Sequence, residues 1–178
     1  MSGAAKILPY YTYDEWVNWE GQWELIDGIP YAMSPMLVPD HQRIGSNLII
    51  EFGNELKKCR ECNVYQPLDY KVSEDTIIQP DLLVVCGVID KKFLDFPPVL
   101  VAEVLSPSTA LKDRHNKFII YQQQQIKYYL VVSPEKKEVE VYAMEDEVYS
   151  LKHSGSSFVY HFTFNDNCSA VVDFKEIW

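Results

Sequence analysis

Two short apolar runs, each with a carboxylate at its edge or inside it, constrain the fold of this chain most strongly. Leu82–Cys86 follows Gln79-Pro80-Asp81, and Pro98–Leu105 contains Glu103. Runs of this length and composition are typical of interior strands that are covered on both faces. An unpaired carboxylate there would cost several kcal/mol or would stay neutral. Carboxylates on neighbouring strands can instead share a divalent cation, so the pattern indicates a metal site with hydrolytic chemistry.

The size and hydropathy of the chain predict one domain spanning residues 1–178. With 178 residues, of which 47% are hydrophobic, the chain can fill a real core. No apolar run approaches the roughly 20 residues that cross a bilayer. The first residues also lack the apolar core of a signal peptide. We therefore expect a soluble, cytoplasmic protein.

The formal net charge of −10 bears on the class of substrate. It argues against a broad, non-specific attraction to nucleic acid phosphates. A DNA enzyme can nevertheless be acidic overall if its basic residues line one groove. The dense basic cluster near the candidate site consists of Lys112, Arg114, His115 and Lys117. The charge therefore weakens the case for a DNA substrate without removing it.

The four cysteines do not form a recognisable local motif. Cys59 and Cys62 are closely spaced, whereas Cys86 and Cys168 stand apart. A structural zinc site usually needs a second ligand pair, and no Cys-x-x-Cys or His-x-x-x-His follows. A redox Cys-x-x-Cys normally opens a helix, but this pair closes a helical segment. We expect reduced cysteines with no special role.

Periodicity along the chain predicts a mixed α/β (α+β) fold. The Asp27-Gly28 turn indicates a hairpin over 23–33, and apolar residues at helical spacing indicate a helix over 41–58 with Asp40 as its N-cap. The other expected elements are a helix at 13–17, strands within 64–72, a polar turn at 73–76, the two carboxylate-bearing strands, a helix over 111–124, a strand at 128–132, a hairpin pairing 138–143 with 148–152, and a strand and helical turn within 171–178. Together these elements predict a central mixed β-sheet flanked by helices on both faces, plus hairpins.

The helix expected after the Glu103 strand carries a candidate catalytic lysine. Asp113, Lys117, Tyr121 and Gln124 share one face of that helix. If the helix packs back over the sheet, as crossover helices do, Lys117 can point at the carboxylate pair. A lysine there could orient a water molecule or offset charge that builds on a phosphorus atom.

The order of these features resembles the PD-(D/E)XK nucleases, and the full run is similar to their branch of Uma-type restriction endonucleases. The resemblance covers nearly the whole chain, and its most specific part runs from Glu103 to Lys117. The residues that carry it are 23–28, 40–42, 79–81, 103–109, 113–117, Tyr121 and 127–132. It implies a restriction-endonuclease-like core and a Mg²⁺ or Mn²⁺ cofactor. Asp81 and Glu103 would hold the metal, and we expect the backbone carbonyl of Val104 as a further ligand.

The chain departs from the general superfamily pattern at one position. The place of the motif lysine is taken by Leu105, which cannot act as one. In this branch the lysine has moved to the following helix, which is the position of Lys117. The resemblance thus implies Asp81, Glu103 and Lys117 as the catalytic residues.

Four further residues are candidates for supporting roles. The resemblance implies that Glu24 is a third acidic wall of the site and that His41 faces it. Glu24 could equally be an ordinary hairpin residue, and His41 could simply contact the first turn of its own helix. Asp113 is either an acid favoured at a helix start or a partner for Lys117. Tyr121 shares the helix face of Lys117.

The leading hypothesis from the sequence is a Mg²⁺- or Mn²⁺-dependent DNA endonuclease. It would act as a homodimer, because a single active site cuts only one strand. One rival is a non-catalytic nucleic-acid or protein binding module that has kept the fold. Another is a metal-dependent hydrolase of a different phosphodiester, such as RNA or a nucleotide.

Overall fold

A computed structural model describes residues 8–33, 38–106 and 113–178, without the side chains of residues 113 and 114. Its largest element is a mixed sheet in the order β10-β9-β8-β7-β6-β3. Neighbouring strands are antiparallel except β7 and β8, which are parallel. These strands are β3 (Cys62–Tyr65), β6 (Leu82–Cys86), β7 (Leu100–Val104), β8 (Tyr128–Ser133), β9 (Glu138–Glu145) and β10 (Val148–Gly155).

Two smaller sheets complete the strand structure. One has the order β2-β1-β5-β4, and the other is the hairpin of β11 and β12. Their strands are β1 (Trp23–Ile26), β2 (Ile29–Ala32), β4 (Tyr70–Ser73), β5 (Thr76–Ile78), β11 (Val159–Asn165) and β12 (Cys168–Asp173). The predicted hairpin turn is confirmed: Asp27 and Gly28 have φ of 51° and 73°, as a tight turn between twisted strands requires. The sequence did not predict β5 or β11.

The helices are α1 (Tyr13–Trp16), α2 (Pro39–Leu56), the π-helical turn η1 (Asp113–Lys117) and α4 (Phe118–Gln123). The prediction that Asp40 caps α2 was wrong. Val38 is the N-cap residue, and Pro39, whose ring fixes a helical φ and whose missing N–H costs nothing there, begins the helix. Asp40 lies in the first turn, where its carboxylate pairs with Arg43 at 3.0 Å.

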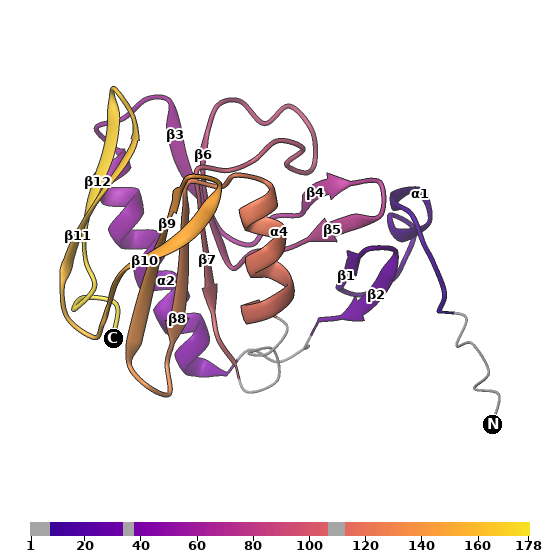
Figure 1. Ribbon diagram of the computed structural model, residues 1–178, viewed down its shortest axis with the longest axis horizontal. Coiled ribbons are helices and arrows are strands. Elements are labelled where there is room, and N and C mark those ends of the chain that lie inside the picture. Colours follow the sequence, from indigo (N-terminus) through magenta and orange to yellow (C-terminus); the bar gives the residue numbers. More distant parts are fainter. Residues whose placement is uncertain (1–7, 34–37, 107–112) are drawn as a thin grey trace.

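Alternation along the central strands sends side chains to two separate apolar cores. Leu82, Val84 and Leu100 pack on the α2 side, where the β11–β12 hairpin also contributes. Leu83, Val101 and their neighbours pack against α4 and the β4–β5 region. Figure 1 shows α2 and α4 on opposite sides of the central sheet. The predicted mixed sheet with helices on both faces is therefore confirmed.

The prediction of reduced cysteines is contradicted. Cys59 is bonded to Cys168 and Cys62 to Cys86, so no cysteine in the described residues is free. Local spacing could not reveal this, because the partners are 109 and 24 residues apart in sequence. Pairing of β3 with β6 sets Cys62 directly opposite Cys86.

None of the described helices combines the length and the apolar character needed to cross a membrane.

Candidate active site

The pairing of β6 with β7 brings Asp81 and Glu103 together. Leu82 lies opposite Ala102, and the same antiparallel register continued by one residue sets Asp81 opposite Glu103. Opposed residues project from the same face, here the α4 side, since Leu83 and Val101 point there. Asp81 itself lies just before β6, where it retains some exposure to solvent, whereas Glu103 is buried inside β7.

Asp81 is held by two contacts. Its Oδ2 accepts the backbone N–H of Val104 at 2.8 Å and lies 3.3 Å from Nε2 of His41. His41 is buried in the first turn of α2, so the helix start delivers its imidazole to the carboxylate. The structure thus places His41 beside Asp81, which is one of the two outcomes that the sequence left open.

Lys117 lies between two buried glutamates. Its Nζ is 2.9 Å from Oε1 of Glu24 and 3.0 Å from Oε1 of Glu103. The exposed fraction of the residue surface is 3% for Lys117, 2% for Glu24 and 1% for Glu103. Ionised groups at this depth are tolerated when they are paired, and this ammonium contacts both carboxylates while offsetting one of their two charges. We call these three residues the buried ion triad.

The strand pairings explain why Glu24 reaches the triad. β1 pairs with β5, setting Leu25 opposite Ile77, and the chain then continues through Gln79 into Asp81. Oε1 of Glu24 accepts the backbone N–H of Gln79 at 2.9 Å, and the Gln79 carbonyl accepts a long bond from Lys117 at 3.5 Å. The sequence left two possibilities for Glu24, a wall of the site or an ordinary hairpin residue. Its burial and its contact with Lys117 favour the first.

Tyr121 contacts the triad from α4, one helical turn beyond Lys117. Its hydroxyl donates a hydrogen bond to Oε1 of Glu103. Complete burial, reinforced by the charge of Glu103, raises the pKa of Tyr121 well above its usual value. The phenol therefore stays protonated and acts as a donor.

The structure describes the side chains of two of the four residues in the predicted basic cluster. Lys117 is buried in the triad and His115 is exposed beside it. Lys112 lies outside the described residues. Asp113 begins η1, but its side chain and that of Arg114 are not described, so their predicted roles stay predictions.

Sequence reasoning missed the part played by Gln79 and Asp69. The Gln79 backbone links Glu24 to Lys117, and its side-chain Nε2 donates to Asp69 Oδ1 at 3.0 Å. Burial, with a smaller contribution from Glu24, raises the pKa of Asp69, and the Gln79 bond opposes this shift. The only sequence signal was that Gln79 precedes the Pro-Asp pair.

A cavity of about 390 Å³ opens where β7 ends. Its lining includes Leu105 and Ser106, which follow β7, and Asp40 from α2. The acids Glu135, Glu138 and Glu140 and the base Lys136 line the β8–β9 side. This rim is mainly acidic.

The donor set of the site fits a hard divalent cation. Asp81, Glu103 and the Val104 carbonyl offer oxygen ligands, the type that Mg²⁺ prefers. In the part of the chain that the structure describes, no three His, Asp or Glu side chains bring their ligand atoms within 4.8 Å of one another. The metal therefore stays a proposal, in which one or two carboxylates would hold Mg²⁺ together with several waters.

Comparisons with known proteins agree with this fold. The sequence pattern of the Uma2 family, described as "Putative restriction endonuclease", matches residues 10–160. A curated protein from Synechocystis sp., described as uncharacterised, is 33% identical over 150 residues, which are 79% of this chain and 77% of that protein. The crystal structure of a DUF820 protein from Anabaena variabilis, described as a "putative nuclease", superposes with a TM-score of 0.76 at 17% identity, covering 93% of this chain and 96% of that one.

The fold is that of the restriction-endonuclease-like nucleases. This chain belongs to the Uma2 family.

Proposed function

We propose that this chain is a divalent-metal-dependent endonuclease that hydrolyses phosphodiester bonds in DNA. The observation that carries the proposal is the buried ion triad beside Asp81. A lysine placed so deeply loses hydration, and stability alone rarely rewards a buried ion pair over apolar packing. Since the chain belongs to the Uma2 family, described as "Putative restriction endonuclease", we take the role of the buried lysine to be catalytic.

In this proposal, Asp81, Glu103 and the Val104 carbonyl hold Mg²⁺ or Mn²⁺. The bound ion supplies Lewis acidity and a more acidic water. His41 fixes the orientation of Asp81, with which it is in contact. Lys117 has its ammonium next to Glu103, from where it can orient the attacking water and offset charge that builds on the phosphorus.

Glu24 and Tyr121 act as positioning residues. Glu24 is a second partner of the Lys117 ammonium beside Glu103, and Tyr121 holds Glu103 from α4. Fixed partners of this kind keep reacting groups in a productive geometry. From its spacing to Lys117 in the sequence, Asp113 is proposed to assist the lysine.

A homodimer follows from the same proposal, because one site cleaves one strand and a duplex has two.

A hydrolase of a smaller phosphodiester is the second candidate. The net charge of −10 favours it, since this charge opposes long contact with a duplex.

The test is cleavage of supercoiled plasmid with Mg²⁺, with Mn²⁺ and with EDTA, alongside RNA and a small phosphodiester ester. We expect metal-dependent nicking that Lys117→Ala reduces by about 100-fold or more. Lys117→Arg should rescue poorly, because a planar guanidinium cannot replace a compact ammonium. Lys127→Ala, an exposed lysine, is the matched control and should cut normally.

Purified protein that binds the metal but cleaves no substrate would support a non-catalytic binding module instead. Cleavage of only the small ester would select the second candidate. Full cleavage by a folded Lys117→Ala protein would contradict the assigned role of the lysine.

A further inference from the structure

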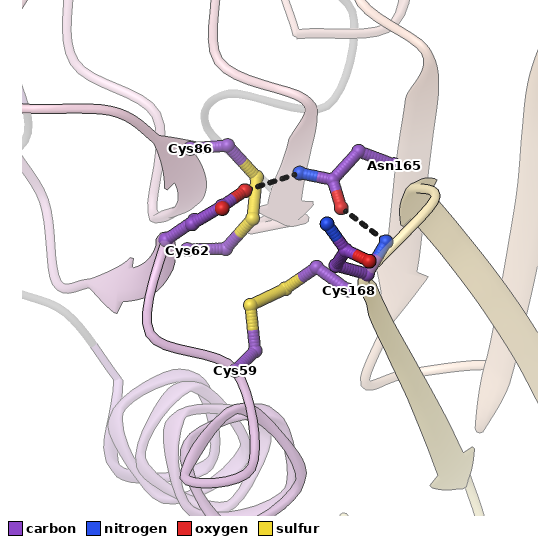
Figure 2. Close-up of a disulfide and its surroundings, with 7 residues drawn as sticks. Cys59, Cys62, Cys86, Asn165 and Cys168 are labelled. Atoms are coloured by element: carbon purple, nitrogen blue, oxygen red, sulfur yellow. Dashed lines mark hydrogen bonds between the residues drawn. A yellow bond between two sulfur atoms is a disulfide. The ribbon is translucent and has the colours of Figure 1, made fainter.

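The four cysteines of the chain meet at one place, on the opposite side of the sheet from the buried ion triad. Cys59 lies in the loop after α2, Cys62 begins β3, Cys86 ends β6 and Cys168 begins β12. Figure 2 shows the two disulfides side by side, where the loop leaving α2 meets the edge of the sheet and the start of β12. Two sulfur pairs that are remote in sequence thus share one site.

The sulfur positions are compact enough for a single metal ion. The Sγ atoms of Cys59, Cys62 and Cys168 all lie within 4.8 Å of one another. The fourth sulfur, from Cys86, is bonded to that of Cys62. In a tetrahedral zinc site with Zn–S bonds of about 2.3 Å, neighbouring sulfurs are about 3.8 Å apart. Three sulfurs already meet this spacing, and the Cys86 sulfur, which lies outside the group of three, must rotate toward them once its bond to Cys62 is opened.

Hydrogen bonds that do not involve sulfur hold the cysteine-bearing segments together. The Gly87 N–H donates to the Glu61 carbonyl at 3.0 Å, which joins the Cys59–Cys62 loop to the end of β6. Asn165, the last residue of β11, donates from Nδ2 to Oε2 of Glu61 at 3.2 Å (Figure 2). The Cys59 N–H donates to Leu56 at the end of α2. The segments should therefore stay gathered when the disulfides are reduced.

The burial of the cluster suits a structural metal and not a reactive surface thiol. Cys62 and Cys168 are buried, while Cys59 and Cys86 are partly exposed. Closed sets of four thiolates are typical of structural zinc, and soft sulfur ligands exclude Mg²⁺. The cluster is therefore chemically separate from the oxygen ligands of the candidate active site.

We propose that the reduced chain binds one zinc ion through the thiolates of Cys59, Cys62, Cys86 and Cys168, and that the two disulfides are the oxidised form of the same site. Two equivalents of a dithiol supply the four electrons of reduction. Each dithiol closes to a cyclic disulfide, and its two protons pass to two cysteine sulfurs. Zinc then displaces the four thiol protons and joins the end of α2, β3, β6 and β12.

The proposal does not depend on nuclease activity, and its test uses metal spectroscopy. The full chain is reduced without oxygen and titrated with Co²⁺, which reports geometry by its visible spectrum. One equivalent should give the intense bands of tetrahedral cobalt thiolate, and one equivalent of Zn²⁺ should abolish them. Zinc should also raise the melting temperature of the reduced chain, because the metal binds the folded state.

Variants distinguish a built site from loose thiol binding. Cys86→Ser should weaken zinc binding by at least about tenfold, since the loss of even an outer partner of a ligand costs 10–100-fold. Cys59→His keeps a ligand and should retain one equivalent of metal with a shifted cobalt spectrum, which guards against a variant that simply fails to fold. Asp81→Asn, in the other site, should leave the cobalt spectrum unchanged.

Absence of the intense tetrahedral bands, saturation of those bands at other than one equivalent of Co²⁺, or an unchanged spectrum in Cys86→Ser would each overturn the proposal. Disulfides that resist excess dithiol in the folded chain would overturn it as well.

Discussion

Replacing Lys117 by methionine tests the reasoning behind the buried ion triad most directly. The change keeps the length and much of the volume of the side chain but removes its charge. In the wild type, the Lys117 ammonium lies 2.9 Å from a Glu24 oxygen and 3.0 Å from a Glu103 oxygen. In the variant, no cation lies between these two carboxylates. Removing one partner from a buried ion pair costs about 3–5 kcal/mol, because the remaining charge stays buried and uncompensated.

We therefore expect urea unfolding of Lys117→Met at neutral pH to give a free energy of unfolding lower by about 3–5 kcal/mol. The loss should shrink in acid, where protonation of a carboxylate removes the repulsion. Adding Glu24→Gln to Lys117→Met should recover part of the loss, and the double-mutant cycle measures the coupling. Lys127→Met, at an exposed lysine, should stay within about 0.5 kcal/mol of the wild type.

A Lys117→Met protein as stable as the wild type at neutral pH would refute this account. It would mean that the two glutamates are protonated or hydrated in the native state, and that Lys117 does not compensate them.

Three further predictions address the surroundings of the triad. Calorimetry should show Mn²⁺ binding that disappears in Asp81→Asn, and unchanged binding in a folded variant would exclude Asp81 as a ligand. Tyr121→Phe should lower the free energy of unfolding by about 1–3 kcal/mol in urea, because Glu103 loses a buried donor; an unchanged value would show that the bond is replaced by water. Asp69→Asn should stabilise the chain at neutral pH, since burial raises the Asp69 pKa and the ionised form is disfavoured in the fold. That gain should vanish as the pH falls below the usual aspartate pKa, where both folded and unfolded states are protonated, and a gain that is constant with pH would contradict it.

Local patterns in the sequence predicted the elements on which the site is built. The strands around Asp81 and Glu103, the hairpin at Asp27-Gly28 and the crossover helix each have a signal within a few residues. The inward direction of Lys117 also followed from its helical spacing to Tyr121. What these features share is that the deciding interaction is close in sequence.

The features that sequence reasoning missed depend on pairings between distant segments. Strand β5 has only three residues, too few for a periodic signal, and it is defined by its pairing with both β1 and β4. The contact of Glu24 with Gln79 depends on that pairing. Likewise, Cys168 meets Cys59 only because β12 packs against the end of α2. No local periodicity encodes these approaches, so the resemblance to a family was the only guide to Glu24.

The charges around the site connect its resting state with the proposed metal chemistry. Ionised Glu24, Glu103 and Asp81 carry three negative charges, and Lys117 returns one positive charge, so two negative charges remain when His41 is neutral. A divalent cation held by Asp81 and Glu103 would cancel them, and repulsion among the carboxylates would then favour metal entry. The same balance explains why the lysine need not leave when the ion binds: its ammonium neutralises one carboxylate while the metal neutralises the other two. An apolar residue at position 117 would leave one charge unmatched even in the metal-bound state, which is a physical reason for a lysine at this buried position.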